Sequence, residues 1–188
     1  RQRIETALAA GADGVQIAVP FWLELADDEL EQFVRDCAAC ASGAGVVLYQ
    51  TQRAKRKLGP ELLGRLANEL PNLVGTKDTG CTLDALRAQL AVAPQLAIFG
   101  GEHDLSERLA AGGKGAYCSI TGLNARRVVE LYELLVAGRS AEAAPLQAAI
   151  RRYTFELLLP MVQEGLWDSA VDRVQRVADN CLVHALED

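Results

Sequence analysis

Two side chains with catalytic chemistry close two apolar runs of the sequence. Lys77 follows residues 73–76, where a charge is costly and burial lowers the pKa of a lysine. A neutral amine attacks a ketone to form a Schiff base, and the resulting iminium withdraws electrons from the neighbouring carbon. Lys77 is therefore a candidate nucleophile. The alternative is that the Lys77 side chain extends to the surface and pairs with Asp78.

Tyr49 closes another apolar run, residues 46–48, one expected strand before Lys77. The carboxyl ends of adjacent parallel strands meet at the same edge of a sheet, so both side chains can reach one site. A phenol there can carry protons to and from a substrate. A core tyrosine with a hydrogen-bonded hydroxyl is the alternative for Tyr49 alone. The pair is more specific than either residue by itself.

Five short apolar runs along the chain predict the strands that position these residues. They begin 32, 27, 23 and 19 residues apart, which are the lengths of βα units, and they are apolar on both faces, as in buried parallel strands. The expected strands are residues 14–19, 46–49, 73–77, 96–100 and 115–120.

Helical patterns fill the intervals between the runs. We expect helices at 26–41 (capped by Asp27 or Asp28), from Gly59–Pro60 onward, at 83–90 (capped by Thr82), and through Leu109 (capped by Asp104 or Ser106). After Asn124 the strand signals stop. The remaining sequence predicts helices at 125–137, at 140–159 ending near Pro160, and at 164–184.

This order of elements predicts an α/β fold with a parallel sheet, in which residues 1–124 carry the βα units and residues 125–188 form a C-terminal helical region. A complete (β/α)₈ barrel needs about 250 residues, and at least roughly 200. A doubly wound sheet would suit five strands. It usually carries a glycine-rich loop after its first strand, whereas this chain has Pro20, Phe21 and Trp22 there.

Composition excludes several classes of function. The net charge of −6 and the pI near 5.0 argue against nucleic-acid binding. No apolar run approaches the roughly 18 residues that span a membrane, and the first residues, from Arg1 to Thr6, lack the apolar region of a secretory leader, so we expect none. Five cysteines, an odd number, favour a reducing cytoplasm over a disulfide framework. Only two histidines occur, so a histidine-rich metal site is excluded.

Six short motifs resemble the dihydrodipicolinate synthase and N-acetylneuraminate lyase family of class I aldolase-type barrels. They are Gly-Ala-Asp-Gly at 11–14, Val-Pro-Phe-Trp at 19–22, Leu-Tyr at 48–49, Gly-Thr-Lys-Asp at 75–78, Phe-Gly-Gly at 99–101 and Gly-Ala-Tyr-Cys-Ser at 115–119. Their order and spacing match the fourth to eighth strands of that (β/α)₈ barrel. The resemblance covers nearly the whole chain, and its most specific parts are the Tyr49-to-Lys77 spacing and the motif around Lys77.

The resemblance implies a cytoplasmic lyase or synthase that acts on pyruvate or another small 2-oxo acid. Lys77 would form the imine and Tyr49 would relay protons. Tyr117 would lie near the imine, and the backbone of Gly100 and Gly101 would line the pocket. No metal or organic cofactor is expected, because the lysine supplies the electron sink. The resemblance also suggests a homo-oligomer. A non-catalytic relative that binds a small acid is the alternative.

The sequence departs from the family in two places. The first three βα units of the family, with a Gly-Thr-Thr/Ser-Gly-Glu motif for the substrate carboxylate, would precede Arg1, so we expect the chain to be a fragment. In addition, the synthase pattern Tyr-Asn-x-Pro-x-Arg-Thr is replaced after Tyr49 by Gln-Thr-Gln-Arg-Ala-Lys-Arg-Lys. Arg53 matches the family arginine only with a one-residue gap, which leaves the acceptor substrate open.

The cations Arg53, Lys55, Arg56 and Lys57 of this loop could attract an anionic substrate. A solvated helix face is the alternative, favoured for all of them except Arg53.

Other motifs have simpler interpretations. Cys37 and Cys40 form a CxxC on an expected helix, where core packing explains them better than zinc or redox chemistry. Residues 101–104, Gly-Glu-His-Asp, resemble a metal-binding motif but contain only one histidine, so we do not expect a metal site there. Residues 112–115 would be the phosphate loop of a barrel enzyme that forms no imine, but they precede a strand rather than a helix.

Overall fold

The computed structural model describes residues 1–166, with residues 121–123 described by their backbone alone. The chain divides into two compact units. The first holds residues 1–100 and 110–115, and the second holds residues 101–109 and the chain from Ala116 onward.

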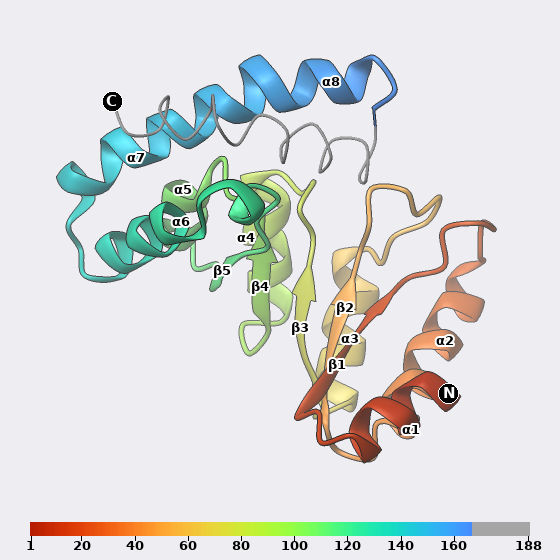
Figure 1. The fold of residues 1–188 in the computed structure, drawn as a ribbon. Coiled ribbons are helices and arrows are strands. Elements are labelled where there is room, and N and C mark those ends of the chain that lie inside the picture. Colours follow the sequence, from red (N-terminus) through yellow and green to blue (C-terminus); the bar gives the residue numbers. More distant parts are fainter. Residues whose placement is uncertain (167–188) are drawn as a thin grey trace. The chain divides into compact units, whose positions relative to one another are not determined.

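A single five-stranded sheet organises the chain, and its strands follow one another in sequence order, β1-β2-β3-β4-β5 (Figure 1). The pairs β1–β2, β2–β3 and β3–β4 are parallel. The strands are β1 (Gly14–Ala18), β2 (Gly45–Tyr49), β3 (Leu73–Lys77), β4 (Ala97–Gly100) and β5 (Gly115–Ala116). The predicted α/β class with a parallel sheet is confirmed.

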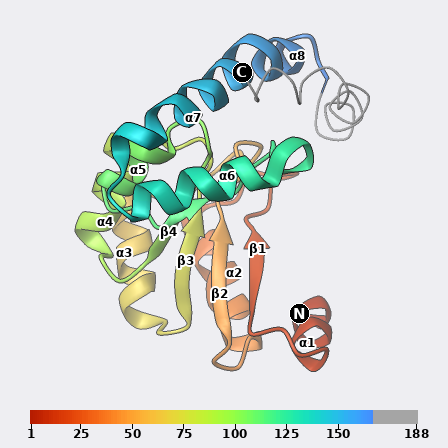
Figure 2. The same cartoon turned by 60° about the vertical axis from the view of Figure 1, so that its left-hand side comes forward.

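Helices α2, α3 and α4 lie on one face of this sheet (Figure 2). Their apolar stripes pack against the strands because side chains at i, i+3 and i+4 share one side of a helix. The helices of the first unit are α1 (Gln2–Ala9), α2 (Asp27–Cys40), α3 (Pro60–Glu69) and α4 (Leu83–Val92). The buried core joins helix residues to strand residues, among them Leu30, Val34, Leu63, Leu66, Leu86, Val46, Leu48, Leu73 and Ile98.

Local capping decides where the helices begin. The Thr82 hydroxyl accepts a hydrogen bond from the Ala85 N–H at 3.1 Å, as predicted. The predicted aspartate cap of α2 is wrong, because the N-cap is Ala26, whose N–H donates to the Glu29 carboxylate at 2.8 Å. Asp27 lies instead in the first turn, where a negative charge complements the helix dipole. The sequence patterns did not predict α1.

The second unit contains α5 (Leu105–Ala110), α6 (Thr121–Val136), α7 (Ser140–Arg152), the π-helical segment η1 (Tyr153–Leu158) and α8 (Leu159–Gln163). α6 begins earlier than predicted and kinks at Asn124. The predicted helix end near Pro160 is wrong. The chain instead continues through η1, which leaves Pro160 in the first turn of α8, where its missing N–H is not needed.

Two predicted boundaries at the end of the chain also change. The strand expected at 115–120 is only two residues long, because the Ser119 N–H donates to the Glu102 carboxylate at 2.9 Å instead of pairing with a strand. Residues 164–165 form a turn, and the rest of the helix expected at 164–184 falls, from 167 on, outside the described residues. Within residues 1–166, no helix is long and apolar enough to cross a membrane.

An ion-pair network joins α2 to α3. Glu31 of α2 accepts hydrogen bonds from Arg35 at 2.8 Å and from Arg65 of α3 at 2.7 Å. Arg35 also pairs with Glu69 of α3. The Arg65 guanidinium, followed by that of Arg35, lowers the pKa of Glu31 to about 2. The folded state therefore gains stability from this carboxylate above its ordinary pKa of 4.5, and loses that gain as the pH falls toward about 2.

We expect Glu31→Gln to lower the urea midpoint of unfolding at pH 7, and we expect the difference from wild type to shrink as the pH falls from about 4.5 to about 2. Circular dichroism across this pH series measures the difference. Asp84→Asn is the matched control, because Asp84 pairs with Arg87 within the same helix, α4, and both side chains are exposed. A midpoint difference that stays constant with pH would contradict the role of the Glu31 charge.

Candidate active site

The structure brings the two predicted catalytic residues together at the carboxyl ends of β2 and β3. Tyr49 and Lys77 are partners in the register of these strands. The Lys77 Nζ lies 4.0 Å from the centroid of the Tyr49 ring, within the range of a cation–π contact. An amine beside a phenol can combine with a carbonyl compound while protons are exchanged. The catalytic roles of both residues stay predictions.

Close packing of the strands fixes where Lys77 stands. A Cβ added at Gly75 would lie 2.5 Å from the carbonyl oxygen of Ala97, so only glycine permits this approach of β3 to β4. The hydrogen-bond ladder also continues past the strand ends. The Gln50 N–H donates to the Lys77 carbonyl, and the Asp78 N–H donates to the Phe99 carbonyl, both at 2.9 Å. The backbone on both sides of the Lys77 side chain is therefore held.

Residues 50–58, the loop after β2, are tied to this edge of the sheet at both ends. The Gln50 Oε1 accepts a hydrogen bond from the Leu58 N–H at 2.9 Å, which closes the loop on itself. The Lys57 Nζ lies 3.0 Å from the Asp78 Oδ1. Asp78 follows Lys77 directly and is only 4% exposed. Sequence reasoning identified neither Gln50 nor this ion pair.

The four cations of this loop do not lie on a helix: residues 52–53 form a turn, residues 55–56 form a bend, and the rest of 51–59 has no regular secondary structure. The alternative that these cations form a solvated helix face is therefore wrong. Arg56 pairs with Asp27 of α2 at 2.7 Å, and Lys57 pairs with Asp78, so both serve as loop anchors. Arg53 is exposed, and its backbone N–H donates to the Thr51 hydroxyl at 3.3 Å. The substrate-binding role of Arg53 stays a prediction.

Gln50 is nearly inaccessible to solvent, at 1% exposure. Its Oε1 accepts the hydrogen bond from the Leu58 N–H, whereas its Nε2 has no hydrogen-bond acceptor among the described residues. An unsatisfied buried amide costs about 1–3 kcal/mol. The motif departure at this position, where the synthase pattern has asparagine, is the only signal that could have drawn attention to Gln50.

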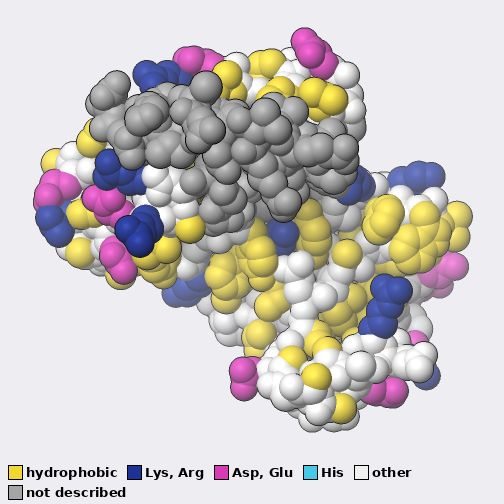
Figure 3. Space-filling view, viewed as in Figure 1, with side chains coloured by type: hydrophobic (Ala, Val, Ile, Leu, Met, Phe, Trp, Pro, Cys, Tyr) yellow, Lys and Arg dark blue, Asp and Glu magenta, His cyan; other side chains and the backbone are white. Residues whose placement is uncertain are grey.

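An apolar loop follows β1 in the same unit. Val19 and Pro20 are buried, whereas Trp22 is 71% exposed and contacts Phe21 edge-to-face at 5.4 Å between ring centroids. Figure 3 shows hydrophobic side chains gathered over the loop between β1 and α2. The segment that directly follows β1, residues 19–23, therefore contributes apolar surface.

The second unit carries the other two predicted site residues. Gly101 follows β4 and is buried, and Tyr117 follows β5 and is 38% exposed. Between them the buried Glu102 accepts hydrogen bonds from the Ser119 N–H at 2.9 Å and from the Ser119 Oγ at 2.6 Å. This carboxylate joins the segments that follow β4 and β5. The roles of Gly101 and Tyr117 toward substrate stay predictions.

Internal contacts account for the ligand-like segment at 101–104. Asp104 pairs with the buried Arg108 at 2.5 Å, and His103 packs edge-to-face on Phe155 with ring centroids 5.8 Å apart. Burial, followed by the charge of Glu102, raises the pKa of the Cys118 thiol to about 12. Cys118 is thus a thiol at neutral pH and a poor nucleophile.

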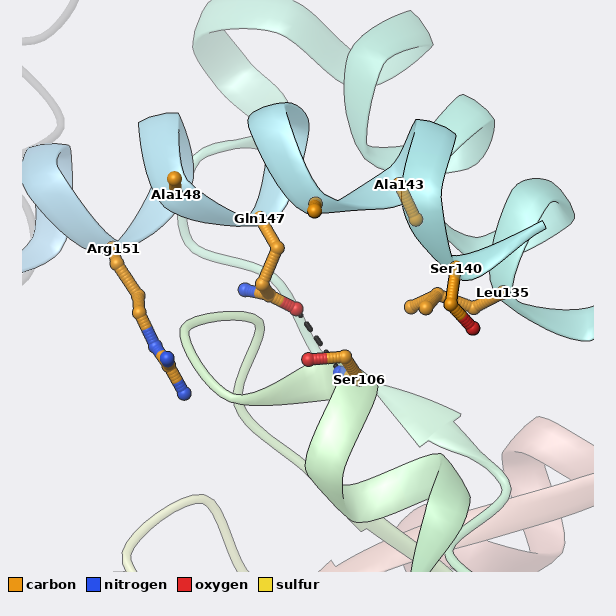
Figure 4. Close-up of a pocket in the computed structure, with 8 residues that line it drawn as sticks. Ser106, Leu135, Ser140, Ala143, Gln147, Ala148 and Arg151 are labelled. Atoms are coloured by element: carbon orange, nitrogen blue, oxygen red, sulfur yellow. Dashed lines mark hydrogen bonds between the residues drawn. The ribbon is translucent and has the colours of Figure 1, made fainter. Parts of the chain in front are cut away.

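A pocket of about 380 Å³ also lies in the second unit (Figure 4). Its wall is mostly apolar. The Gln147 Oε1 accepts a hydrogen bond from the Ser106 N–H at 3.0 Å across the pocket, and Arg151 pairs with Glu107, which does not line the pocket. None of the predicted site residues lines it. The lining residues are Ser106, Leu135, Ser140, Ala143, Ala144, Gln147, Ala148 and Arg151.

Comparison with known proteins identifies relatives over most of the chain. Residues 3–166 match the Dihydrodipicolinate synthetase family. A 4-hydroxy-tetrahydrodipicolinate synthase of Synechococcus sp. (strain CC9605) is 32% identical over 150 residues, which are 77% of this chain and 48% of that protein. A 4-hydroxy-tetrahydrodipicolinate synthase 1 of Streptomyces coelicolor is 32% identical over 171 residues, which are 88% of this chain and 54% of that protein. The chain thus spans about half the length of these relatives.

Solved structures show the same fold. The crystal structure of YagE from Escherichia coli K12, a prophage protein of the dihydrodipicolinic acid synthase family in complex with pyruvate, aligns with a TM-score of 0.81 at 24% identity. The alignment covers 95% of this chain and 59% of that one. The five strands described above thus form part of a (β/α)₈ barrel, followed by C-terminal helices, as the sequence predicts.

Proposed function

The chain belongs to the dihydrodipicolinate synthetase family, and we propose that it is a lyase or synthase that forms a Schiff base between Lys77 and pyruvate or another 2-oxo acid. The observation that carries this proposal is the position of the Lys77 Nζ, 4.0 Å from the Tyr49 ring centroid at the ends of adjacent strands. The full reaction is aldol cleavage, condensation or dehydration.

The proposed chemistry begins with attack of the neutral Lys77 amine on the C2 carbonyl of the oxo acid. The new carbon–nitrogen bond forms as the carbonyl oxygen takes up a proton, which gives a carbinolamine. Loss of water then gives the protonated imine. The hydroxyl of Tyr49 donates and recovers the protons of these steps. The iminium accepts the electron pair when the bond at the next carbon is broken, and it supplies that pair as an enamine when the bond is formed.

The other site residues would bind the substrate. Arg53 is proposed to meet an anionic group of the acceptor, and Tyr117 and the backbone at Gly101 to line the imine pocket. The loop after Tyr49 lacks the Asn, Pro and Thr of the synthase pattern, so the proposal leaves the acceptor open. We further propose that the enzyme works in the cytoplasm, needs no metal or organic cofactor and assembles as a homo-oligomer, as is usual for the family.

Borohydride trapping tests the proposal. The natural protein in full is incubated with pyruvate and sodium borohydride, and the adduct is located by intact mass and peptide mapping. We expect one reduced pyruvate adduct, on Lys77. A panel of sugar-derived 2-oxo acids follows, because each covalent adduct reports an acceptable carbonyl substrate. Binding of these acids in calorimetry without any adduct, in a folded sample, would contradict the proposal and favour a non-catalytic small-acid-binding relative.

A further inference from the structure

One layer of side chains crosses the sheet at the carboxyl ends of its strands. Tyr49 and Lys77 are register partners on β2 and β3, and Lys77 and Phe99 are register partners on β3 and β4. Register partners on parallel strands project from the same face of a sheet, and neighbouring strands lie about 4.8 Å apart. Lys77 therefore stands between two aromatic residues, one on each neighbouring strand.

This layer projects from the face of the sheet that is turned away from α2, α3 and α4 (Figure 2). Ile98, the residue before Phe99, is 1% exposed and belongs to the core between the sheet and these helices. Leu48, the residue before Tyr49, is fully buried in the same core. Because successive side chains of a strand point to opposite faces, Phe99 and Tyr49 share the other face with Lys77. All three of these side chains are partly exposed.

The two aromatic neighbours of Lys77 differ in their chemistry. Tyr49 carries a hydroxyl, and its ring centroid lies 4.0 Å from the Lys77 Nζ. Phe99 has no polar side-chain atom, so it can neither transfer a proton nor hydrogen-bond a carboxylate. What Phe99 offers a substrate is the volume of a rigid apolar ring. A wall of this kind selects by size, and one methylene group that does not fit changes the rate by about 10–200-fold.

We propose that Phe99 is a specificity-determining residue of the imine site, whose ring forms the wall beside Lys77 and excludes 2-oxo acids that are branched at C3. This inference rests on the proposed function of Lys77. It narrows the substrate class to 2-oxo acids whose C3 is a methyl or methylene group. Because Phe99 acts by its volume, removal of its ring should widen the choice of substrate and leave the nucleophile and the Tyr49 hydroxyl in place.

A comparison of two oxo acids tests the proposal. The natural protein in full is trapped with borohydride in the presence of pyruvate or of 3-methyl-2-oxobutanoate, which is branched at C3, and peptide mapping gives each rate of adduct formation on Lys77. The rate with the branched acid is divided by the rate with pyruvate, so the intrinsic reactivities of the acids cancel between variants. We expect Phe99→Ala to raise this ratio at least about tenfold and Phe99→Leu to raise it less. Phe99→Tyr, which keeps the ring, should stay within about twofold of wild type.

Ile98→Val is the matched control, because Ile98 precedes Phe99 on β4 but faces the helices. This substitution removes one buried methylene and lowers stability without opening space beside Lys77. Its ratio should equal that of wild type. If Phe99→Ala leaves the ratio unchanged, or if Ile98→Val changes it equally, Phe99 is no wall of the site and the proposal is overturned. Phe99→Leu carries the test should Phe99→Ala not fold.

A second readout keeps this proposal separate from the proposed function. Acetic and isobutyric anhydrides acylate neutral amines without forming an imine, and only the isobutyryl group is branched beside its carbonyl carbon. Peptide mapping gives the isobutyryl-to-acetyl ratio at Lys77, with the exposed Lys114 as the reference in the same sample. If wild type traps no oxo acid while Phe99→Ala raises this ratio at Lys77, the proposed function fails and the wall formed by Phe99 stands. An unchanged ratio with both kinds of reagent overturns the role of Phe99.

Discussion

Lys77→Ala is expected to abolish the borohydride-trapped pyruvate adduct. The substitution removes the amine that lies 4.0 Å from the centroid of the Tyr49 ring at the strand ends. Removal of a covalent nucleophile costs on the order of 10⁴-fold or more in turnover, because the steps that pass through the intermediate have no other route. Intact mass with peptide mapping measures the adduct, and steady-state kinetics with the accepted oxo acid measures turnover.

Two comparisons make the Lys77→Ala result specific. The midpoint of thermal unfolding should stay close to that of wild type, because Lys77 ends its strand and is not part of the buried core. Lys114→Ala is the matched control, since Lys114 is an exposed lysine whose backbone N–H pairs with Ile98 outside the proposed site. Undiminished trapping in a folded Lys77→Ala variant would place the imine on another lysine and refute the assignment.

Tyr49→Phe is expected to lower turnover by roughly 10²–10⁴-fold while leaving the fold intact, because general acid–base catalysis contributes about that factor. Phenylalanine keeps a ring beneath the Lys77 Nζ and removes only the hydroxyl that would carry protons. The pyruvate adduct should still form, but more slowly. Quenching the borohydride-trapping reaction at increasing times gives the rate of imine formation. Steady-state kinetics gives the rate of the full reaction.

The control for this variant is Tyr132→Phe, which removes a phenol from the half-exposed face of α6. Tyr132→Phe should leave both rates within about twofold of wild type. If Tyr49→Phe also left both rates unchanged, Tyr49 would serve only as a packing partner of Lys77, and the proton relay would have to be sought elsewhere.

The sequence by itself determined the fold class and the pair at its centre. Apolar runs at βα spacing predicted each strand, because a parallel strand buried on both faces must be apolar throughout. Lys77 and Tyr49 interrupt that apolar pattern at the strand ends, and the sequence alone was therefore enough to identify them as candidates. Their register, Tyr49 opposite Lys77, follows from the same rule that places the carboxyl ends of parallel strands at one edge.

Only the tertiary structure decided how the strand-end groups are paired. Lys57 and Asp78 are 21 residues apart, and no periodicity or spacing rule connects a loop cation with a carboxylate after the next strand. The sequence offered Lys77 itself as a partner for Asp78 and a helix for the loop. Likewise, the short β5 follows from the Glu102 carboxylate, which takes the Ser119 N–H from 17 residues away. Which residues are buried in the core can be predicted from the local periodicity of apolar residues. The pairing of polar groups depends on which distant segments the tertiary structure brings within hydrogen-bond distance.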